Sequence, residues 1–370
     1  MEPRKTPLYE KHIENKAHIV DFSGWALPIE YTSILKEAKA VRSSCGLFDA
    51  SHMGEIIIKG SQPLDFLQAL TPNDISKTKP GQLQYNVFLN EKAGIIDDLM
   101  VYNLGNSFLC VVNASNINKV YTHLCKAKLE GKYVNPDNVE IVDESPDISL
   151  LSLQGPESVK VISEIFGKDI NNLKYMHFIQ VNFKNKNIIL SRSGYTGEDG
   201  FEMYCPNGIA VPLWDIILEK GKQCNLCLCG LGARDVLRIE AGYPLYGHEI
   251  NDSTNPLEAS LDWVVKLKKD FIAKDKLKKA EIARLRVGFV MSDRAIARQG
   301  YSVYSKDKII GEVTSGTFSP NLDKFIGMAY VEKELSKPGT PIEIKIRDKF
   351  YKAQISDFNF VKSRTKRGLQ

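Results

Sequence analysis

Three strand-like segments follow one another between residues 82 and 114, and their spacing constrains the fold of the chain more than any other feature. They cover residues 84–89, 95–102 and 108–113, and short turns that contain Gly and Asn separate them. Strands joined by turns of this length pair with their neighbours in sequence as an antiparallel meander. The pattern therefore predicts an antiparallel sheet in this part of the chain.

Helical segments are interleaved with further strands on both sides of the meander. Apolar residues recur at helical spacing in residues 32–44, 63–70, 116–130, 156–166, 210–219 and 230–242, and strand patterns fall at 55–59, 139–142, 148–153, 187–192 and 201–204. Helices alternating with antiparallel strands indicate an α+β fold. Beyond residue 287, short strands with Gly and Pro turns dominate, which favours a small β-barrel. The Lys-rich residues 266–282 are predicted to connect the two parts.

The length and charge of the chain limit its class. Its 370 residues exceed one comfortable hydrophobic core, so two or three domains are expected. The net charge of +4 is small and dispersed, so we expect no nucleic-acid partner; the basic run at 362–367 is predicted to be a solvated tail. No stretch approaches the roughly 18 apolar residues of a membrane span, and the start lacks a signal-peptide core. We therefore predict a cytoplasmic protein with no membrane partner.

Cysteine usage argues against a disulfide framework. The seven cysteines are odd in number and scattered, except for Cys224, Cys227 and Cys229. A metal site there would need a second Cys or His pair at ligand spacing, and the intervening leucines alternate with the thiols as in a buried strand. We therefore interpret these cysteines as small core hydrophobes and expect no metal.

Two adjacent carboxylates, Asp97 and Asp98, interrupt the second strand of the meander. Asp is depleted in strands, so the pair reduces local stability unless it serves a turn or chemistry. One interpretation is a turn after residue 94 in which backbone amides satisfy Asp97, since Asp is a common turn residue. The other interpretation is a functional carboxylate, and other unusual strings in the chain favour it.

Two further strings carry candidate chemistry. Asp49, Ser51 and His52 lie next to one another, but a working catalytic triad gathers its members from separate elements, so we predict structural roles for Asp49 and His52. Residues 194–202 contain three glycines and end on Glu202, which opens a strand. These glycines let the backbone pass close to other groups. The segment is either a tight hairpin loop or a pocket wall in which Glu202 pairs with an amidine-like N–C–N edge.

These strings together resemble the aminomethyltransferase (T-protein) family of the glycine cleavage system. Seven of them occur in the order of the family, and the likeness covers essentially the whole chain: TPLY (6–9), DFSGW (21–25), FDASHM (48–53), GIIDDL (94–99), GYTGEDGFE (194–202), GLGARD (230–235) and TSGTFSP (314–320).

The resemblance implies a fold and a reaction. The family has a three-domain cloverleaf with folate in a central hole and a β-barrel at its C-terminal end. We expect residues 1–54 and 154–265 to form a first α+β domain, 55–153 a second, and 280–370 the barrel. The implied reaction moves the one-carbon unit of the aminomethyl-lipoyl H-protein to tetrahydrofolate. Its products are 5,10-methylenetetrahydrofolate, ammonia and the dihydrolipoyl H-protein, and it needs neither metal nor flavin.

The resemblance also assigns site residues. Asp97 is similar to the family's carboxylate beside the reactive folate nitrogens, where an anion raises nucleophilicity and stabilises developing positive charge. An ordinary Asp, with a pKa of about 3.9, is ionised at neutral pH for this purpose. The expected folate-binding residues are Glu202 at the amino-pyrimidine edge, Tyr85 and Tyr195 at the ring walls, Asn113 near the reacting end, Arg234, and Arg364 at the folate tail.

Other readings of the sequence stay open. Arg234 is alternatively a helix residue paired with Asp235, and Arg364 is alternatively part of a solvated tail, because Asn359 stands where the family has Pro. A related folate-binding protein of iron–sulfur maintenance is disfavoured, because residues 242–249 contain no Cys. The flavin domain of sarcosine-oxidising relatives has no room in this chain. A tetrahydrofolate-dependent demethylase and a non-catalytic folate-binding protein remain as alternatives.

Overall fold

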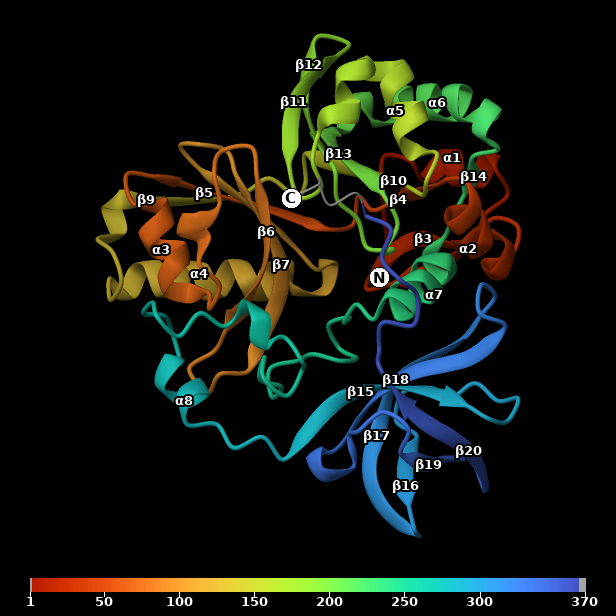
Figure 1. Cartoon of the computed structure of the whole chain (residues 1–370). Coiled ribbons are helices and arrows are strands. Elements are labelled where there is room, and N and C mark those ends of the chain that lie inside the picture. The colour runs from red at the N-terminus through yellow and green to blue at the C-terminus, as the bar shows by residue number, and fades with distance from the viewer. Residues whose placement is uncertain (1, 366–370) are drawn as a thin grey trace.

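The computed structural model describes residues 2–365, which are arranged as three groups of elements around a common centre (Figure 1). One group is the predicted meander with two helices, the second is a larger sheet with helices, and the third is a closed barrel at the C-terminal end. The predicted α+β class with antiparallel sheets and a C-terminal β-barrel is confirmed. The domain bounds given above stay a prediction.

The meander lies in a five-stranded sheet with the order β6-β7-β8-β5-β9, in which every neighbouring pair is antiparallel. Its helices bury Phe66, Leu67 and Leu124 against one face of the sheet, and Pro63 occupies the first turn of its helix, where no N–H is needed. The elements are β5 (Gly54–Gly60), α3 (Pro63–Leu70), β6 (Leu83–Leu89), β7 (Ile95–Asn103), β8 (Phe108–Val112), α4 (Ile117–Glu130) and β9 (Val139–Asp143).

A six-stranded sheet with the order β11-β12-β13-β10-β4-β14 forms the second group, and only its β4–β14 pair is parallel. Two helices cover it and bury Trp214 and Val161 in a hydrophobic core cluster. The strand at residues 178–183 was not predicted. The elements are β4 (Gly46–Asp49), β10 (Ile148–Gln154), α5 (Ser158–Phe166), β11 (Phe178–Phe183), β12 (Lys186–Ser191), β13 (Gly200–Pro206), α6 (Ala210–Gly221) and β14 (Cys227–Leu228).

The N-terminal segment adds a small sheet, of order β1-β3-β2, that the sequence did not predict. Its strands are short, and β1 spans two residues, so periodicity gives little signal. Ala38 and Val41 of one helix pack against Ala233 and Leu237 of another beside this sheet. The elements are β1 (Arg4–Lys5), α1 (Tyr9–Glu14), β2 (His18–Phe22), β3 (Trp25–Glu30), α2 (Ile34–Ser43) and α7 (Leu231–Ala241).

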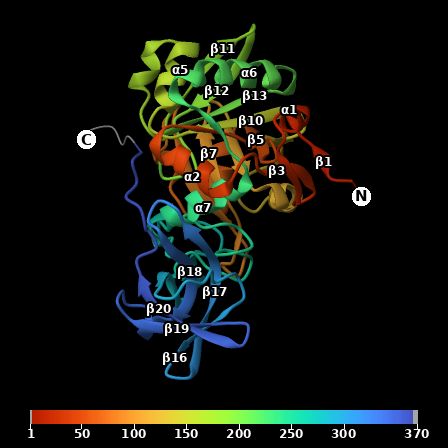
Figure 2. The same cartoon turned by 90° about the vertical axis from the view of Figure 1, so that its right-hand side faces the viewer.

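The C-terminal strands close into a barrel in the order β15-β18-β17-β16-β19-β20. Figure 2 shows the barrel at one end of the molecule, with α7 between it and the other sheets. The predicted connector contains one short helix, α8 (Lys274–Lys278). The strands are β15 (Arg284–Met291), β16 (Ser302–Ser305), β17 (Lys308–Ser319), β18 (Lys324–Glu332), β19 (Pro341–Ile346) and β20 (Lys349–Ser356).

Short 3-10 turns connect several of these elements. They are η1 (Ile75–Lys77), η2 (Ala114–Asn116), η3 (Pro136–Asn138), η4 (Lys168–Asn172), η5 (Asn207–Ile209), η6 (Lys222–Cys224), η7 (Asp262–Val264) and η8 (Lys333–Leu335).

The cysteines, candidate metal ligands, candidate membrane spans and C-terminal tail complete the comparison with the sequence. Cys224 and Cys229 are buried and Cys227 is half-buried, as expected of core thiols. No group of three or more His, Cys, Asp or Glu suited to a metal ion occurs within residues 2–365. In the same range, none of the helices is long and apolar enough to span a membrane. Lys366 and Arg367 of the predicted tail lie outside the described residues.

Candidate active site

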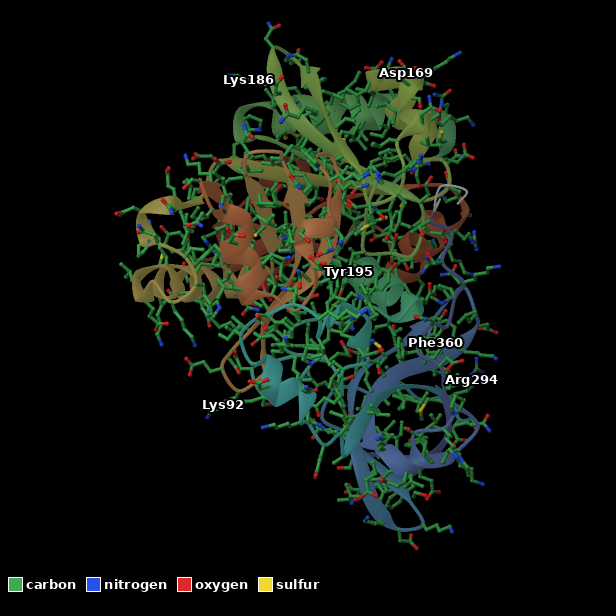
Figure 3. The ribbon with its side chains drawn as sticks, turned by 60° about the vertical axis from the view of Figure 1, so that its left-hand side comes forward. Lys92, Asp169, Lys186, Tyr195, Arg294 and Phe360 are labelled. Atoms are coloured by element: carbon green, nitrogen blue, oxygen red, sulfur yellow. The ribbon has the colours of Figure 1, made fainter. Side chains whose placement is uncertain are left out.

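A cavity of about 2260 Å³ lies where the two large sheets, α7 and the barrel approach one another. Residues from all of these parts contribute to its wall, and the C-terminal segment after β20 lies along it. Figure 3 places Tyr195, one of the wall residues, near the middle of the molecule. Five predicted site residues line this cavity: Tyr85, Asn113, Tyr195, Glu202 and Arg234.

The two carboxylates of β7 point to opposite sides of their strand, as successive strand residues do. Asp98 lines the cavity and is partly exposed to it, whereas Asp97 is fully buried and, among the described residues, does not contribute to the wall. Asp97 accepts hydrogen bonds from the Asn113 backbone N–H (2.9 Å), Asn113 Nδ2 (2.8 Å) and Asn116 Nδ2 (2.6 Å). The carboxylate that faces the cavity is therefore Asp98.

Asp98 is held by two donors from different elements. Tyr85 of β6 donates its phenolic O–H to Asp98 Oδ2 at 3.0 Å, and Asn113 Nδ2 donates to Asp98 Oδ1 at 2.8 Å. Asn113 thus contacts both carboxylates. Burial raises the pKa of both groups above the usual range for Asp, and the charge of Asp98 further raises the pKa of Asp97. Asp98 is therefore a carboxylate that exchanges its proton closer to neutral pH than an ordinary Asp does.

Glu202 of β13 reaches the same cavity from the six-stranded sheet. Ser193 donates its hydroxyl to Glu202 Oε2 at 2.5 Å, while Oε1 makes no hydrogen bond to any described residue. Burial raises the pKa of Glu202, and the Ser193 hydroxyl and the Arg234 charge oppose that shift. One oxygen of Glu202 is therefore free to accept hydrogen bonds from a molecule in the cavity.

The glycine-rich segment before Glu202 is shaped by a close approach. A Cβ atom on Gly194 would lie 1.9 Å from Gln154 Oε1, and one on Gly200 would lie 2.5 Å from the Gln154 side-chain amide. Gln154 Nε2 donates to the Ser193 carbonyl at 3.0 Å. The glycines therefore let the segment fold around Gln154, and this packing sets the position of Ser193 beside Glu202.

Aromatic pairs and an arginine form other parts of the wall. Tyr195 stacks on Tyr243 with ring centroids 5.7 Å apart, and the Arg234 guanidinium lies 4.7 Å from the Tyr195 ring centroid. The Tyr195 phenol donates to the Pro244 carbonyl. Tyr85 stacks on Trp263 at 5.4 Å. Such surfaces suit a flat, partly aromatic ligand.

Arg364, a predicted folate-binding residue, is not among the described residues that line the cavity. Its backbone N–H donates to the Gly197 carbonyl at 2.8 Å, its Nη1 donates to the Arg42 carbonyl at 3.2 Å, and its Nε lies 3.7 Å from Glu198 Oε1. Its side chain is 60% exposed and, within residues 2–365, is not part of the cavity wall. Arg364 instead fastens the C-terminal segment beside α2.

Comparison with known proteins identifies the family. The GCVT N-terminal domain model matches residues 8–269, and the glycine cleavage T-protein C-terminal barrel domain model matches residues 284–362. The chain belongs to the aminomethyltransferase family of the glycine cleavage system. It is 45% identical to the aminomethyltransferase of Caldanaerobacter subterraneus subsp. tengcongensis over 98% of this chain and 97% of that protein. The family resemblance seen in the sequence is therefore confirmed.

Two other members agree with this assignment. The aminomethyltransferase of Chlorobium phaeovibrioides is 44% identical over 97% of this chain and 99% of its own length. The crystal structure of the glycine cleavage system aminomethyltransferase T from Bartonella henselae superposes with a TM-score of 0.90 at 33% identity, covering 98% of this chain and 99% of that one. The fold is therefore that of an aminomethyltransferase throughout.

Several wall residues were not predicted from the sequence. Trp263 belongs to the turn η7, and no periodicity marks its stacking on Tyr85. Arg238 follows Arg234 by one helical turn of α7, so the spacing of four residues was available as a signal. His52, for which a structural role was predicted, also lines the cavity; burial lowers its pKa to about 4, so its ring is neutral.

Proposed function

We propose that this chain is a tetrahydrofolate-dependent aminomethyltransferase. It transfers the one-carbon unit of the aminomethyl-lipoyl H-protein to tetrahydrofolate and yields 5,10-methylenetetrahydrofolate, ammonia and the dihydrolipoyl H-protein. The observation that carries the proposal is one cavity into which two carboxylates from different sheets, Asp98 and Glu202, both project. A cytoplasmic location is part of the proposal, and no metal or flavin takes part in the reaction proposed.

Glu202 is the proposed recognition group for the pterin ring of the folate. An aminopyrimidine presents two N–H donors side by side, and a carboxylate accepts such a pair well. The free Oε1 of Glu202 supports this role, because Oε2 is already occupied by Ser193. Tyr195 with Tyr243 offers a stacked aromatic wall, and the Arg234 cation beside it suits an electron-rich or anionic part of the ligand.

Asp98, rather than Asp97, is the proposed carboxylate at the reacting end. The transfer needs a free amine lone pair on the folate and the removal of a proton, and a fixed carboxylate assists both. Only Asp98 of the two faces the cavity. Burial raises the pKa of Asp98 toward the working pH, where a group both accepts and releases protons efficiently. We assign Asp97 to the support of Asn113, which in turn contacts Asp98.

The remaining predicted residues receive more limited roles. We propose that Tyr85 and Asn113 hold Asp98 and form the wall beside it. The family resemblance suggests that Arg364 contacts the folate tail, but its present contacts favour an anchoring role for the C-terminal segment.

The test is turnover of aminomethyl-loaded H-protein with tetrahydrofolate, in which methylenetetrahydrofolate and ammonia are both measured. We expect wild-type turnover, and we expect Asp98→Asn to bind tetrahydrofolate but lose activity. A wild-type protein that binds tetrahydrofolate without turnover would contradict the proposal and favour a non-catalytic folate-binding protein. Turnover with a methylated donor in place of the loaded H-protein would favour a demethylase instead.

A further inference from the structure

Behind Glu202, four hydroxyl groups form a continuous hydrogen-bonded chain. Tyr204 Oη lies 3.0 Å from Tyr102 Oη, Tyr102 Oη lies 3.1 Å from Ser191 Oγ, and Ser191 Oγ lies 2.8 Å from Ser193 Oγ. Ser193 Oγ then lies 2.5 Å from Glu202 Oε2. All five side chains are at most 9% exposed, and Tyr102 and Ser191 in the middle are fully buried, so water does not freely replace the contact between these two hydroxyls.

When Glu202 is ionised, the hydrogen bonds of this hydroxyl chain can all be donated in only one direction. A carboxylate only accepts hydrogen bonds, so Ser193 must donate its single hydroxyl proton to Glu202. The Ser193 oxygen is then left to accept from Ser191. Ser191 has an alternative acceptor in the Glu202 carbonyl, but that contact is longer, at 3.4 Å against 2.8 Å.

The same logic extends to the two phenols. Tyr102 donates to Ser191, and Tyr204 donates to Tyr102, so all four protons point toward Glu202. Hydrogen bonds aligned in this way polarise one another and strengthen the terminal bond to the carboxylate. A protonated Glu202 could itself donate a hydrogen bond, so Ser193 would no longer have to donate to it.

The hydroxyl chain also connects the two large sheets. Tyr102 belongs to β7 of the five-stranded sheet, whereas Ser191, Glu202 and Tyr204 belong to the six-stranded sheet. Tyr102 follows Asp98 by four residues on β7 and therefore lies on the same face of that strand. Through Tyr102, the position of Glu202 is tied to the strand that carries Asp98.

We propose that Ser193 is a positioning residue that favours the ionised form of Glu202 and directs its free oxygen into the cavity, and that Ser191, Tyr102 and Tyr204 act through it. This inference deepens the proposed function, because it rests on Glu202 as the recognition group for the folate ring. Ser193 orients one oxygen, and the other remains available to the ligand. The site therefore meets its ligand with the carboxylate already in place, without a cost of ordering it on binding.

The decisive experiment titrates Glu202 in the ligand-free protein. Its side-chain carboxyl is followed by 13C NMR in glutamate-labelled protein and assigned with Glu202→Gln. A hydrogen bond to a charged group changes an equilibrium by roughly tenfold or more, so Ser193→Ala is expected to raise the Glu202 pKa by at least about one pH unit. Ser193→Thr retains the hydroxyl and is expected to titrate like the wild type.

Two further variants distinguish the effect of the hydroxyl chain on the Glu202 pKa from a general loss of structure. Tyr102→Phe keeps the ring and removes only the hydroxyl, so we expect a smaller upward shift of the same Glu202 pKa. Ser149→Ala changes another buried serine of the same sheet, whose hydroxyl donates to Asn207 instead, and is expected to leave the titration unchanged. An unchanged Glu202 pKa in both Ser193→Ala and Tyr102→Phe would overturn the inference.

Tetrahydrofolate binding distinguishes this inference from the proposed function. Binding is followed through tryptophan fluorescence, since Trp263 lies in the cavity wall. In Ser193→Ala, the pH below which affinity is lost is expected to move upward together with the Glu202 pKa. A wild-type protein that fails to bind tetrahydrofolate would overturn the proposed function, whereas the NMR shifts would still support the hydroxyl chain.

Discussion

The phenol of Tyr85 and the carboxylate of Asp98 are joined by a 3.0 Å hydrogen bond across the β6–β7 pair. Both side chains also form part of the cavity wall. Donation from Tyr85 favours the ionised carboxylate, while burial favours the protonated one and dominates, so the pKa of Asp98 stays raised. This balance between burial and hydrogen bonding sets the pKa of Asp98.

Substitution of the two adjacent aspartates is expected to have different effects. Asp98→Asn retains size but removes the charge that faces the cavity, so kcat should fall by about 10²–10³-fold, while the Kd for tetrahydrofolate changes by less than about threefold. Asp97→Asn presents an NH2 group to the donors of Asn113 and Asn116 and should lower the free energy of unfolding by about 1–3 kcal/mol. Steady-state kinetics and denaturant unfolding of both variants measure the two effects. A folded Asp97→Asn protein that is as inactive as Asp98→Asn would contradict the assignment.

The pH dependence of turnover should report Asp98. If the carboxylate form is active, kcat/KM falls as the pH decreases through the Asp98 pKa, which lies above the ordinary value of about 3.9. Tyr85→Phe removes a donor to the ionised form, so this acid limb should move upward by about one pH unit. Tyr304→Phe, which changes a barrel tyrosine paired with Phe350, serves as the control and should leave the profile in place. A downward shift in Tyr85→Phe would be incompatible with the proposed balance.

Stability should depend strongly on Glu240, a buried residue of α7. Its carboxylate accepts from Arg42 Nε (2.9 Å) and Nη2 (2.8 Å), from Ser319 (2.5 Å) and from Asn321, so it joins α7 to both α2 and the barrel. Glu240→Ala leaves Arg42 with a buried and only partly compensated charge, which typically costs about 3–5 kcal/mol. We expect a clear fall in the midpoint temperature of the first thermal unfolding transition.

A surface ion pair provides the control for Glu240. Glu332 pairs with Lys308 at 2.8 Å, and both side chains are well exposed, at 39% and 69%. Such pairs contribute about 0–1 kcal/mol, so Glu332→Ala should barely move the thermal transition. Equal shifts in the two variants would indicate that the buried network does not stabilise the fold.

The sequence predicted the meander and the place of the acid pair on it, but not which acid faces the cavity. Strand β7 is covered on both sides: Leu99 and Val101 pack toward the helices, whereas Met100 and Tyr102 pack toward the other sheet. Alternation between polar and apolar residues reveals the orientation of a strand only when one face is solvated. The contacts of Trp263 with Tyr85, and of Tyr102 with Ser191, join residues far apart in sequence, so no local pattern predicts them.

The two arginines that were matched to the family should differ in their effect on folate binding. Arg234 lines the cavity and lies over the Tyr195 ring, so Arg234→Gln should raise the Kd for tetrahydrofolate by about tenfold or more. Arg364 is 60% exposed and bonded to the Arg42 carbonyl, so Arg364→Gln should raise it by less than about threefold. Calorimetric titration of both variants with tetrahydrofolate compares them directly. A comparable loss in Arg364→Gln would mean that this side chain leaves Arg42 and Glu198 when folate binds, and would restore the contact with the folate tail that the family resemblance implies.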